Sequence, residues 1–185
     1  MLHLVTPLYR FQNVEKVYRS FSQYPDVKWH MGKSKHKDYT FPHQDDRINV
    51  YDVNCEDDDP VTKRNFALSK VTEGYFHLLD DDTLFHPNMY KLYKEVEKLN
   101  YKGMVIGKQE EKNNKIRLKE IPHPVYCYID AGNVLCHHSA IDYILTNPDK
   151  NKMLAPDYSL WEKAHSFFRE SKMTEDVIST YNMLT

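Results

Sequence analysis

The sequence predicts an α/β fold with a mixed, mostly parallel sheet flanked by helices, in one domain spanning residues 1–185. Short apolar segments of β-prone residues alternate with longer segments of helical spacing, as expected for strands joined by right-handed crossovers. We find no internal repeat, linker or low-complexity tract. One apolar segment also runs directly into a cluster of acids, and α/β proteins bind ligands at the carboxyl ends of strands.

The first half of the chain predicts four strands and three helices. The strands are expected over residues 2–6, 27–31, 48–53 and 75–79, because each is a short run rich in apolar or β-branched residues. The helices are expected over residues 12–23, 62–72 and 87–99, where apolar side chains recur every three or four positions. The apolar positions are Val14, Val17, Tyr18 and Phe21, then Phe66, Ala67 and Val71, then Met89, Leu92, Tyr93, Val96 and Leu99.

The second half predicts a shorter series of the same kind. Strands are expected over residues 104–106, 125–129 and 134–136, and helices over residues 140–146 and 157–169. Residues 110–119 are charged and lack glycine, which predicts a solvated hairpin or loop. The polar residues 147–152 separate the last two helices.

The acidic triplet Asp80–Asp82 follows the apolar strand 75–79 and precedes a helix start at Pro87. Repelling acids at the end of a buried strand are costly unless a cation compensates them. In an extended chain Asp80 and Asp82 would point to the same side, and hard oxygen ligands suit Mg²⁺ or Mn²⁺. The alternative is a solvated acidic turn that caps the next helix.

A second triplet, Asp57–Asp59, provides a comparison within the same chain. It follows a more polar segment and ends at Pro60, so it predicts an exposed loop. The position after a buried strand, not the number of acids, therefore distinguishes the two triplets.

Composition excludes several functional classes. The formal net charge of −2 gives no electrostatic reason to bind nucleic acid or an anionic membrane, and no run of about 18 apolar residues predicts a membrane span. The glycines form neither a Rossmann nor a P-loop motif, so a phosphate would depend on a metal and side chains. Three cysteines without a C-x-x-C pair, and no signal-peptide pattern, predict a reduced, cytoplasmic protein.

Three short segments, in order, resemble the GT-A-fold glycosyltransferases. They are residues 4–10 (LVTPLYR), 64–68 (RNFAL) and 78–82 (LLDDD), and the likeness covers roughly the first 140 residues. The chain is most similar to family 2-like members, including small single-domain ones encoded by large DNA viruses and bacteria, and at the first strand to glucuronyltransferases. The resemblance implies metal-dependent transfer of a sugar from a nucleotide-diphospho-sugar, with a uridine nucleotide expected from the Thr-Pro-x-Tyr match.

The resemblance also implies roles for residues of the donor half, residues 1–99. Asp80 and Asp82 match the outer acids of the D-x-D motif, which hold Mn²⁺ or Mg²⁺ in this family. The second strand lacks the acid that contacts the base in many members, and Asp52 is a candidate replacement. The implied nucleotide-sugar-binding residues are Thr6, Pro7, Tyr9 and Arg10 near the base, Asp52, Arg64 and Asn65 near the donor, and Asp80 and Asp81.

The acceptor half, residues 100–185, contains two candidate catalytic acids. Residues 128–133 resemble the Asp-x-Ala-Gly segment of glucuronyltransferase-like members, which implies that Asp130 faces an acceptor sugar. Residues 155–161 resemble the Glu-Asp-x-x-Leu-Trp pattern of family 2, which implies that Asp157 is the general base of an inverting transfer to a hydroxyl acceptor. A helix N-cap is the alternative role for Asp157. The candidates for a third metal ligand are His137, His138 and His165.

Three other functions fit parts of the sequence. The triplet with Thr83 and Leu84 is similar to the D-x-D-G-T motif of phosphatases and phosphotransferases, but the glycine, the threonine and a downstream G-D-x-x-D are missing. A nucleotidyltransferase would share the fold but needs a glycine-rich N-terminal loop. A non-catalytic module that binds a sugar or nucleotide predicts ligand binding without donor turnover.

Overall fold

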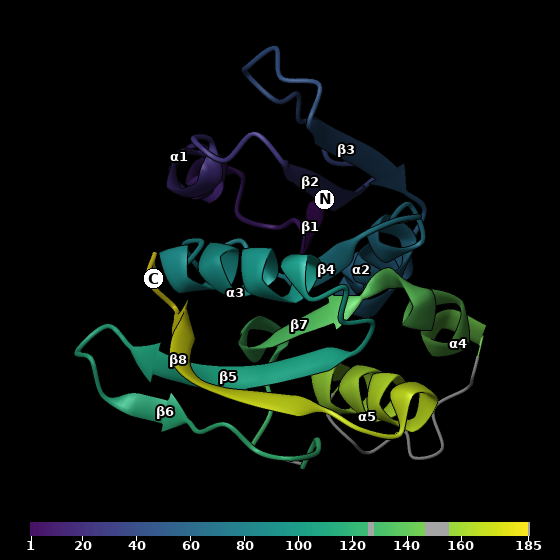
Figure 1. The fold of residues 1–185 in the computed structure, drawn as a ribbon. Helices are drawn as coiled ribbons and strands as arrows, with labels where there is room; N and C mark the ends of the chain where they lie inside the picture. The colour runs from purple at the N-terminus through teal and green to yellow at the C-terminus, as the bar shows by residue number, and fades with distance from the viewer. Residues whose placement is uncertain (126–127, 147–155, 185) are drawn as a thin grey trace.

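A mixed sheet of eight strands extends through the molecule, in the order β3-β2-β1-β4-β7-β5-β6, with β8 paired to β5 (Figure 1). The computed structural model describes residues 1–125, 128–146 and 156–184. The strands are β1 (Leu2–Pro7), β2 (Val27–Ser34), β3 (Ile48–Val53), β4 (Tyr75–Leu78), β5 (Met104–Glu111), β6 (Ile116–Leu118), β7 (Val134–His137) and β8 (Lys172–Tyr181). Strands β1 to β4 are parallel, β7 is antiparallel to both β4 and β5, and β8 is parallel to β5. The predicted fold class is confirmed.

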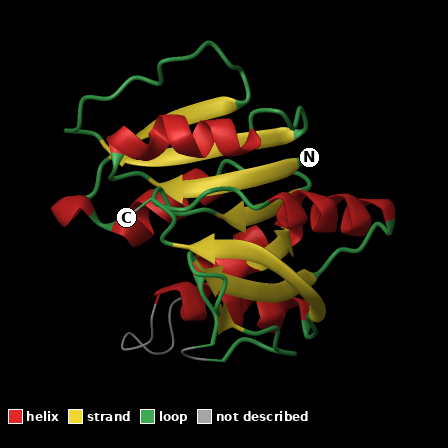
Figure 2. Ribbon diagram, turned by 90° about the vertical axis from the view of Figure 1, so that its left-hand side faces the viewer, coloured by secondary structure: helices red, strands yellow, loops and turns green. Residues whose placement is uncertain are grey.

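Helices cover both faces of the sheet (Figures 1 and 2). The helices are α1 (Val14–Phe21), α2 (Pro60–Leu68), α3 (Pro87–Lys98), α4 (Ile141–Thr146) and α5 (Pro156–Phe168). Leu4 and Val5 point to opposite faces, so one core cluster forms against α1 and α3 and the other against α2, α4 and α5. No helix of the described residues is long and apolar enough to cross a membrane.

The helix boundaries follow from local capping. Helix α2 begins at Pro60, two residues before the prediction, because Asp59 accepts the backbone N–H groups of Val61 (3.2 Å) and Thr62 (2.8 Å). Helix α3 begins at Pro87 as predicted, and its N-cap residue is His86. Short 3₁₀ turns, which the sequence does not signal, lie at Phe11–Asn13, Glu56–Asp58, Ala131–Asn133 and His138–Ala140.

Two predictions for the second half need correction. The predicted strand over residues 125–129 is wrong for Val125, Tyr128 and Ile129, which are not in a strand. Residues 126–127 lie outside the described residues. Strand β8 was not predicted, because its sequence is mostly polar and shows no alternation of apolar and polar residues. Residues 110–119 form the β5–β6 hairpin, one of the two predicted alternatives. The polar stretch 147–152 lies outside the described residues.

The site is positioned by the parallel pairing of β1 with β4. Val5 is paired with Leu78, so both strands end at the same edge of the sheet. Beyond the last pair, the Leu79 backbone N–H donates to the Val5 carbonyl (3.0 Å) and the Thr6 hydroxyl donates to the Leu79 carbonyl (2.5 Å). The loop after β1 and the acidic triplet after β4 are therefore held side by side.

Candidate active site

A cavity of about 350 Å³ opens at this edge, and we call it the acidic recess. The residues that line it come from both halves of the chain and lie far apart in the sequence. Its lining residues are Pro7, Tyr9, Arg10, Pro60, Asp80, Asp81, Asp82, Arg117, Asp130, Tyr181 and Asn182.

The acidic triplet forms a turn rather than a continuation of the strand. The Thr83 backbone N–H donates to the Asp80 carbonyl (3.1 Å), so the predicted alternation of side chains does not apply. All three residues of the triplet nevertheless line the recess. The turn is also tied to the end of β8, because the Leu184 backbone N–H donates to the Asp82 carbonyl (2.9 Å).

The middle acid, Asp81, organises the loop after β1. Its Oδ2 accepts the backbone N–H groups of Tyr9 (2.6 Å) and Arg10 (2.7 Å), and its Oδ1 accepts the Arg10 guanidinium (2.7 Å). Only 2% of Asp81 is exposed. With both oxygens engaged inside the protein, Asp81 fixes the position of Tyr9 and Arg10 instead of facing a ligand.

Asp80 has the most perturbed carboxyl group of the recess. Burial raises its pKa to about 8, and repulsion by Asp157, Asp130, Asp82 and Asp81 adds to the effect. A bound cation would relieve the same repulsion, so the donor chemistry of Asp80 and Asp82 fits a hard divalent ion. Within the described parts of the chain, no three His, Cys, Asp or Glu side chains are arranged to hold a metal, so further ligands would have to come from a bound phosphate or water.

The three histidines considered as further ligands lie outside the recess. His138 bonds the carbonyl of Gly74, the residue before β4, which is the opposite end of that strand. His137 contacts Ser139, and His165 contacts Ser171. None of the three lines the recess.

Three predicted donor-binding residues also lie away from the recess. Thr6 is fully buried, and its hydroxyl accepts the Trp29 indole N–H (2.8 Å) while donating to the Leu79 carbonyl. The exposed carboxylate of Asp52 pairs with Lys33 across the β2–β3 ladder. Asn65 is half-buried on α2 and does not line the cavity.

A smaller cavity of about 210 Å³ adjoins the recess, and we call it the inner pocket. The two cavities share Pro7, Pro60 and Asp80. The other residues that line the inner pocket are Val61, Arg64, Leu78, Ala131, Pro156 and Asp157.

Asp157 and Arg64 form an ion pair in the inner pocket, with Nη1 2.7 Å from Oδ1. Burial raises the pKa of Asp157, and Asp130 raises it further, while Arg64 acts in the opposite direction. The Asp157 carboxyl group lies in the first turn of α5, as the sequence predicts. Its raised pKa favours a role as a proton acceptor.

Asp130 is engaged by several groups around the 3₁₀ turn Ala131–Asn133. Its Oδ1 accepts the Ala131 backbone N–H (2.7 Å), and its Oδ2 binds the Arg117 guanidinium. Its carbonyl accepts the Trp161 indole N–H (3.0 Å), which fixes the turn to α5. A side chain at Gly132 would meet Ser179 of β8 at 2.6 Å, so this glycine permits the approach of the last strand.

The second triplet is only partly the exposed loop that the sequence predicts, because Asp57 is exposed whereas Asp58 and Asp59 are half-buried. Asp58 accepts the Lys63 ammonium group (2.8 Å) and the Ser34 hydroxyl, and its carbonyl accepts the Tyr9 hydroxyl (2.6 Å). Lys63 also donates to the Leu8 carbonyl (3.1 Å). Asp58 and Lys63 thus hold the Tyr9 loop in place through hydrogen bonds with the Tyr9 hydroxyl and the Leu8 carbonyl. No local sequence pattern indicates this role.

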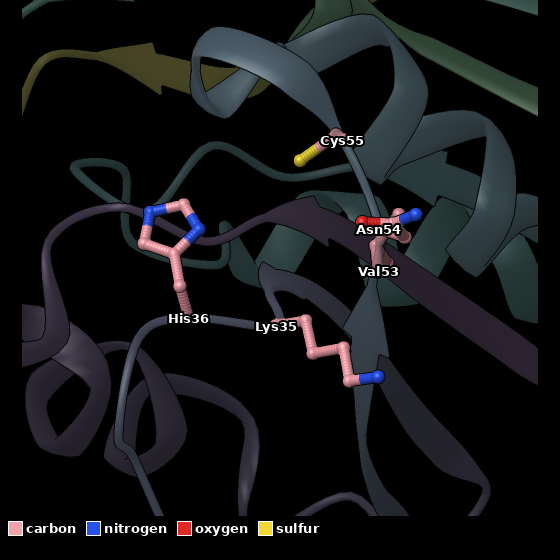
Figure 3. A pocket seen from close by; sticks show the side chains of 5 residues that line it. All are labelled: Lys35, His36, Val53, Asn54 and Cys55. Atoms are coloured by element: carbon pink, nitrogen blue, oxygen red, sulfur yellow. The ribbon is translucent and has the colours of Figure 1, made fainter.

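A third hollow, of about 370 Å³, lies at the carboxyl ends of β2 and β3 (Figure 3). It is lined by Lys35, His36, Val53, Asn54 and Cys55, and contains no carboxylate. The Cys55 thiol lies 3.3 Å from the Ser34 hydroxyl, which connects this hollow to Asp58 and the support of Tyr9.

The fold is GT-A-like. The chain is similar to S. aureus TarS 1–349, with a TM-score of 0.68 and 12% identity over 97% of this chain and 59% of that one. TarS 1–349 in complex with UDP-GlcNAc matches with a TM-score of 0.72 and 13% identity, covering 97% and 57% of the two chains. A structure with UDP gives a TM-score of 0.71 at 13% identity, covering 97% and 59%.

This chain therefore spans about three-fifths of the TarS 1–349 structures that it matches. At such low identity the likeness concerns the fold alone. The sequence matches no protein-family model and no curated protein.

Proposed function

We propose that this chain is a metal-dependent glycosyltransferase that moves a sugar from a UDP-sugar to the hydroxyl group of a glycan or another acceptor. The observation that carries the proposal is the acidic recess, which collects Tyr9, Arg10 and the triplet at the carboxyl ends of two parallel strands. The GT-A-like fold supports it, since the similar TarS structures hold UDP and UDP-GlcNAc. The same fold favours the transferase over the phosphatase alternative.

In this proposal the donor lies across the recess, with its base on Tyr9. Lys63 lies against one face of the Tyr9 ring and Tyr9 lines the recess, so the base is assigned to the other face of the ring. Asp80 and Asp82 would hold Mn²⁺ or Mg²⁺ beside the diphosphate. The ion would neutralise the negative charge that develops on the leaving nucleoside diphosphate.

The transferred sugar is assigned to the inner pocket, beside Arg64 and Asp157. Asp157 then accepts the proton of the acceptor hydroxyl while the acceptor oxygen attacks the anomeric carbon. Direct displacement of this kind inverts the anomeric configuration. The ion pair with Arg64 keeps the Asp157 carboxylate at the wall of the pocket.

A screen of nucleotide sugars for donor hydrolysis, with and without Mn²⁺, tests the proposal without knowledge of the acceptor. We expect UDP-sugars to be hydrolysed only with the metal, and Asp82→Asn to abolish the reaction. Asp57→Asn is the matched control, because Asp57 is exposed in the second triplet. Binding of UDP without any turnover, in the presence of acceptors and Mn²⁺, would instead indicate a non-catalytic binding module.

A further inference from the structure

Arg117, from the second half of the chain, lines the acidic recess together with Tyr9 and Arg10 from the first half. It lies on β6, in the charged hairpin that the sequence predicts to be solvated. The hairpin reaches the site because β5 is longer than β7: its first part pairs with β7 and its last part pairs with β6. Arg117 is therefore placed beside the turn that contains Asp130.

The Arg117 guanidinium is held by three groups. It binds the carboxylate of Asp130 and the side-chain oxygen of Gln109, and its Cζ lies 3.7 Å from the centre of the Tyr181 ring. Gln109 is itself buried and donates to the Ser179 hydroxyl (3.1 Å). The side chain is thus fixed at the wall of the recess before any ligand binds, and 31% of it is exposed.

The charges that line the recess are unevenly distributed. Four carboxylates, those of Asp80, Asp81, Asp82 and Asp130, are accompanied by two guanidinium groups. Arg10 is shared between two carboxylates, Asp81 (2.7 Å) and Asp82 (3.2 Å), whereas Arg117 is paired with one carboxylate and one neutral amide oxygen. A diphosphate that enters this recess needs cationic partners, and a guanidinium binds phosphate oxygens through two parallel hydrogen bonds.

We propose that Arg117 binds the diphosphate of the donor, opposite the metal-binding acids, and that Asp130 is the residue that positions it. The inference rests on the proposed function. When the bond between the anomeric carbon and the diphosphate oxygen breaks, its electron pair stays on that oxygen, and Arg117 stabilises the resulting charge. The new bond forms to the acceptor oxygen, whose proton passes to Asp157. In this assignment Asp130 is not a base.

Calorimetry with UDP and with uridine tests the assignment, because only UDP carries the diphosphate. Arg117→Gln is expected to weaken UDP binding about tenfold or more, both with Mn²⁺ and in chelator, and to leave uridine binding unchanged. Arg117→Lys should recover part of the affinity, since it keeps the charge but not the paired hydrogen bonds. The control is Lys119→Gln, which removes an exposed charge from the same hairpin outside the recess.

Asp130→Asn tests the positioning role through a separate readout. It is expected to raise the KM for donor hydrolysis while kcat changes only severalfold, whereas Asp157→Asn lowers transfer without raising that KM. If Arg117→Gln or, where that variant does not fold, Arg117→Lys binds UDP as the wild type does, the inference is overturned. Failure of the wild type to bind UDP at all would overturn the proposed function as well.

Discussion

The ammonium group of Lys63 lies 2.9 Å from the centre of the Tyr9 ring, and the side chain of Lys63 is fully buried. A buried lysine is rare unless it is paired, and here Asp58 and the Leu8 carbonyl complete its partners. Burial lowers the pKa of Lys63, while Asp58 acts against that shift. These contacts fix the position and the orientation of the Tyr9 ring, on which the nucleobase is proposed to stack.

Lys63→Met should therefore destabilise the protein and weaken UDP binding. The substitution keeps most of the volume but leaves Asp58 with one partner fewer, a loss of about 1–3 kcal/mol in the free energy of unfolding. Urea unfolding and calorimetry measure the two effects. Lys70→Met is the control, because Lys70 lies over the exposed ring of Phe66. Equal effects of the two variants would show that Lys63 has no special role.

Asp82→Asn should remove the metal dependence of UDP binding. Asn provides a neutral oxygen in place of a carboxylate, so a divalent ion gains much less from it. Titration of UDP at several Mn²⁺ concentrations should give a steep dependence for the wild type and a flat one for the variant. The exposed Asp57 again offers the matched Asp→Asn control, whereas Asp58 does not, since it supports the Tyr9 loop.

The metal affinity should increase with pH up to about 8. In the absence of a cation the pKa of Asp80 is raised to about 8, so its carboxyl group is mostly protonated at pH 6.5. A divalent ion must displace that proton, and its binding is weaker at the lower pH. Mn²⁺-dependent UDP binding measured from pH 6 to 9 should tighten and then level off. A profile that is flat across this range would contradict the assignment of Asp80 as a ligand.

Asp157→Asn should bind UDP normally and lose transfer by about 10²–10⁴-fold, the usual contribution of a general base. Asn keeps an oxygen for Arg64, so the wall of the inner pocket is preserved. Product anomers read by NMR should be inverted relative to the donor. Full activity of the variant, or retained configuration, would exclude Asp157 as the base.

The buried pair His3 and His30 should make the fold sensitive to acid. Their ring nitrogens lie 2.9 Å apart, and burial lowers the pKa of His3 to about 3 and that of His30 to about 4. In the unfolded chain both titrate near 6.5, so the unfolded state takes up protons first as the pH falls. The contribution to stability is complete well above pH 6.5 and is lost as the pH falls through that value, by about 1.4 kcal/mol per histidine at pH 5.5.

Urea unfolding between pH 7.5 and 5.5 measures this decline. His30→Phe should reduce the slope, and His36→Gln, which changes an exposed histidine, should leave it unchanged. Burial lowers the pKa values of His77 and His137 to about 4 and also lowers those of His86 and His165, so these histidines contribute in the same direction to the slope that remains. An equal slope for all variants would contradict the contribution of the pair.

The strands that carry the site could be predicted because their signals are local. Strands β1 and β4 are almost entirely buried and mostly apolar, and the acidic triplet closely follows β4. The resemblance added Tyr9, Arg10 and Asp157, all of which line a cavity. These parts depend on short stretches of sequence that fold in the same way in many proteins.

The remaining parts of the site depend on contacts between distant segments. Among the described residues, strand β8 pairs only with β5. Its residues are mostly polar and incompletely buried, so they show no alternation. Arg117 belongs to a three-residue strand in a charged hairpin, and nothing nearby in the sequence distinguishes it from a solvated charge. Lys63 is buried because Gly32 lets β2 approach the α2 backbone, a contact that becomes visible only in three dimensions.

The hydrogen bond from Leu184 to the Asp82 carbonyl makes the recess a junction between the turn after β4 and the residues after β8. A ligand seated there would touch the loop after β1, the turn after β4 and the residues after β8 at once, so its binding energy would oppose unfolding of all three. At a hundred times its dissociation constant, such a ligand adds about 2.7 kcal/mol to the folded state. Ligand binding should then slow amide exchange along residues 172–184, although the acidic triplet of the recess lies about a hundred positions earlier in the sequence.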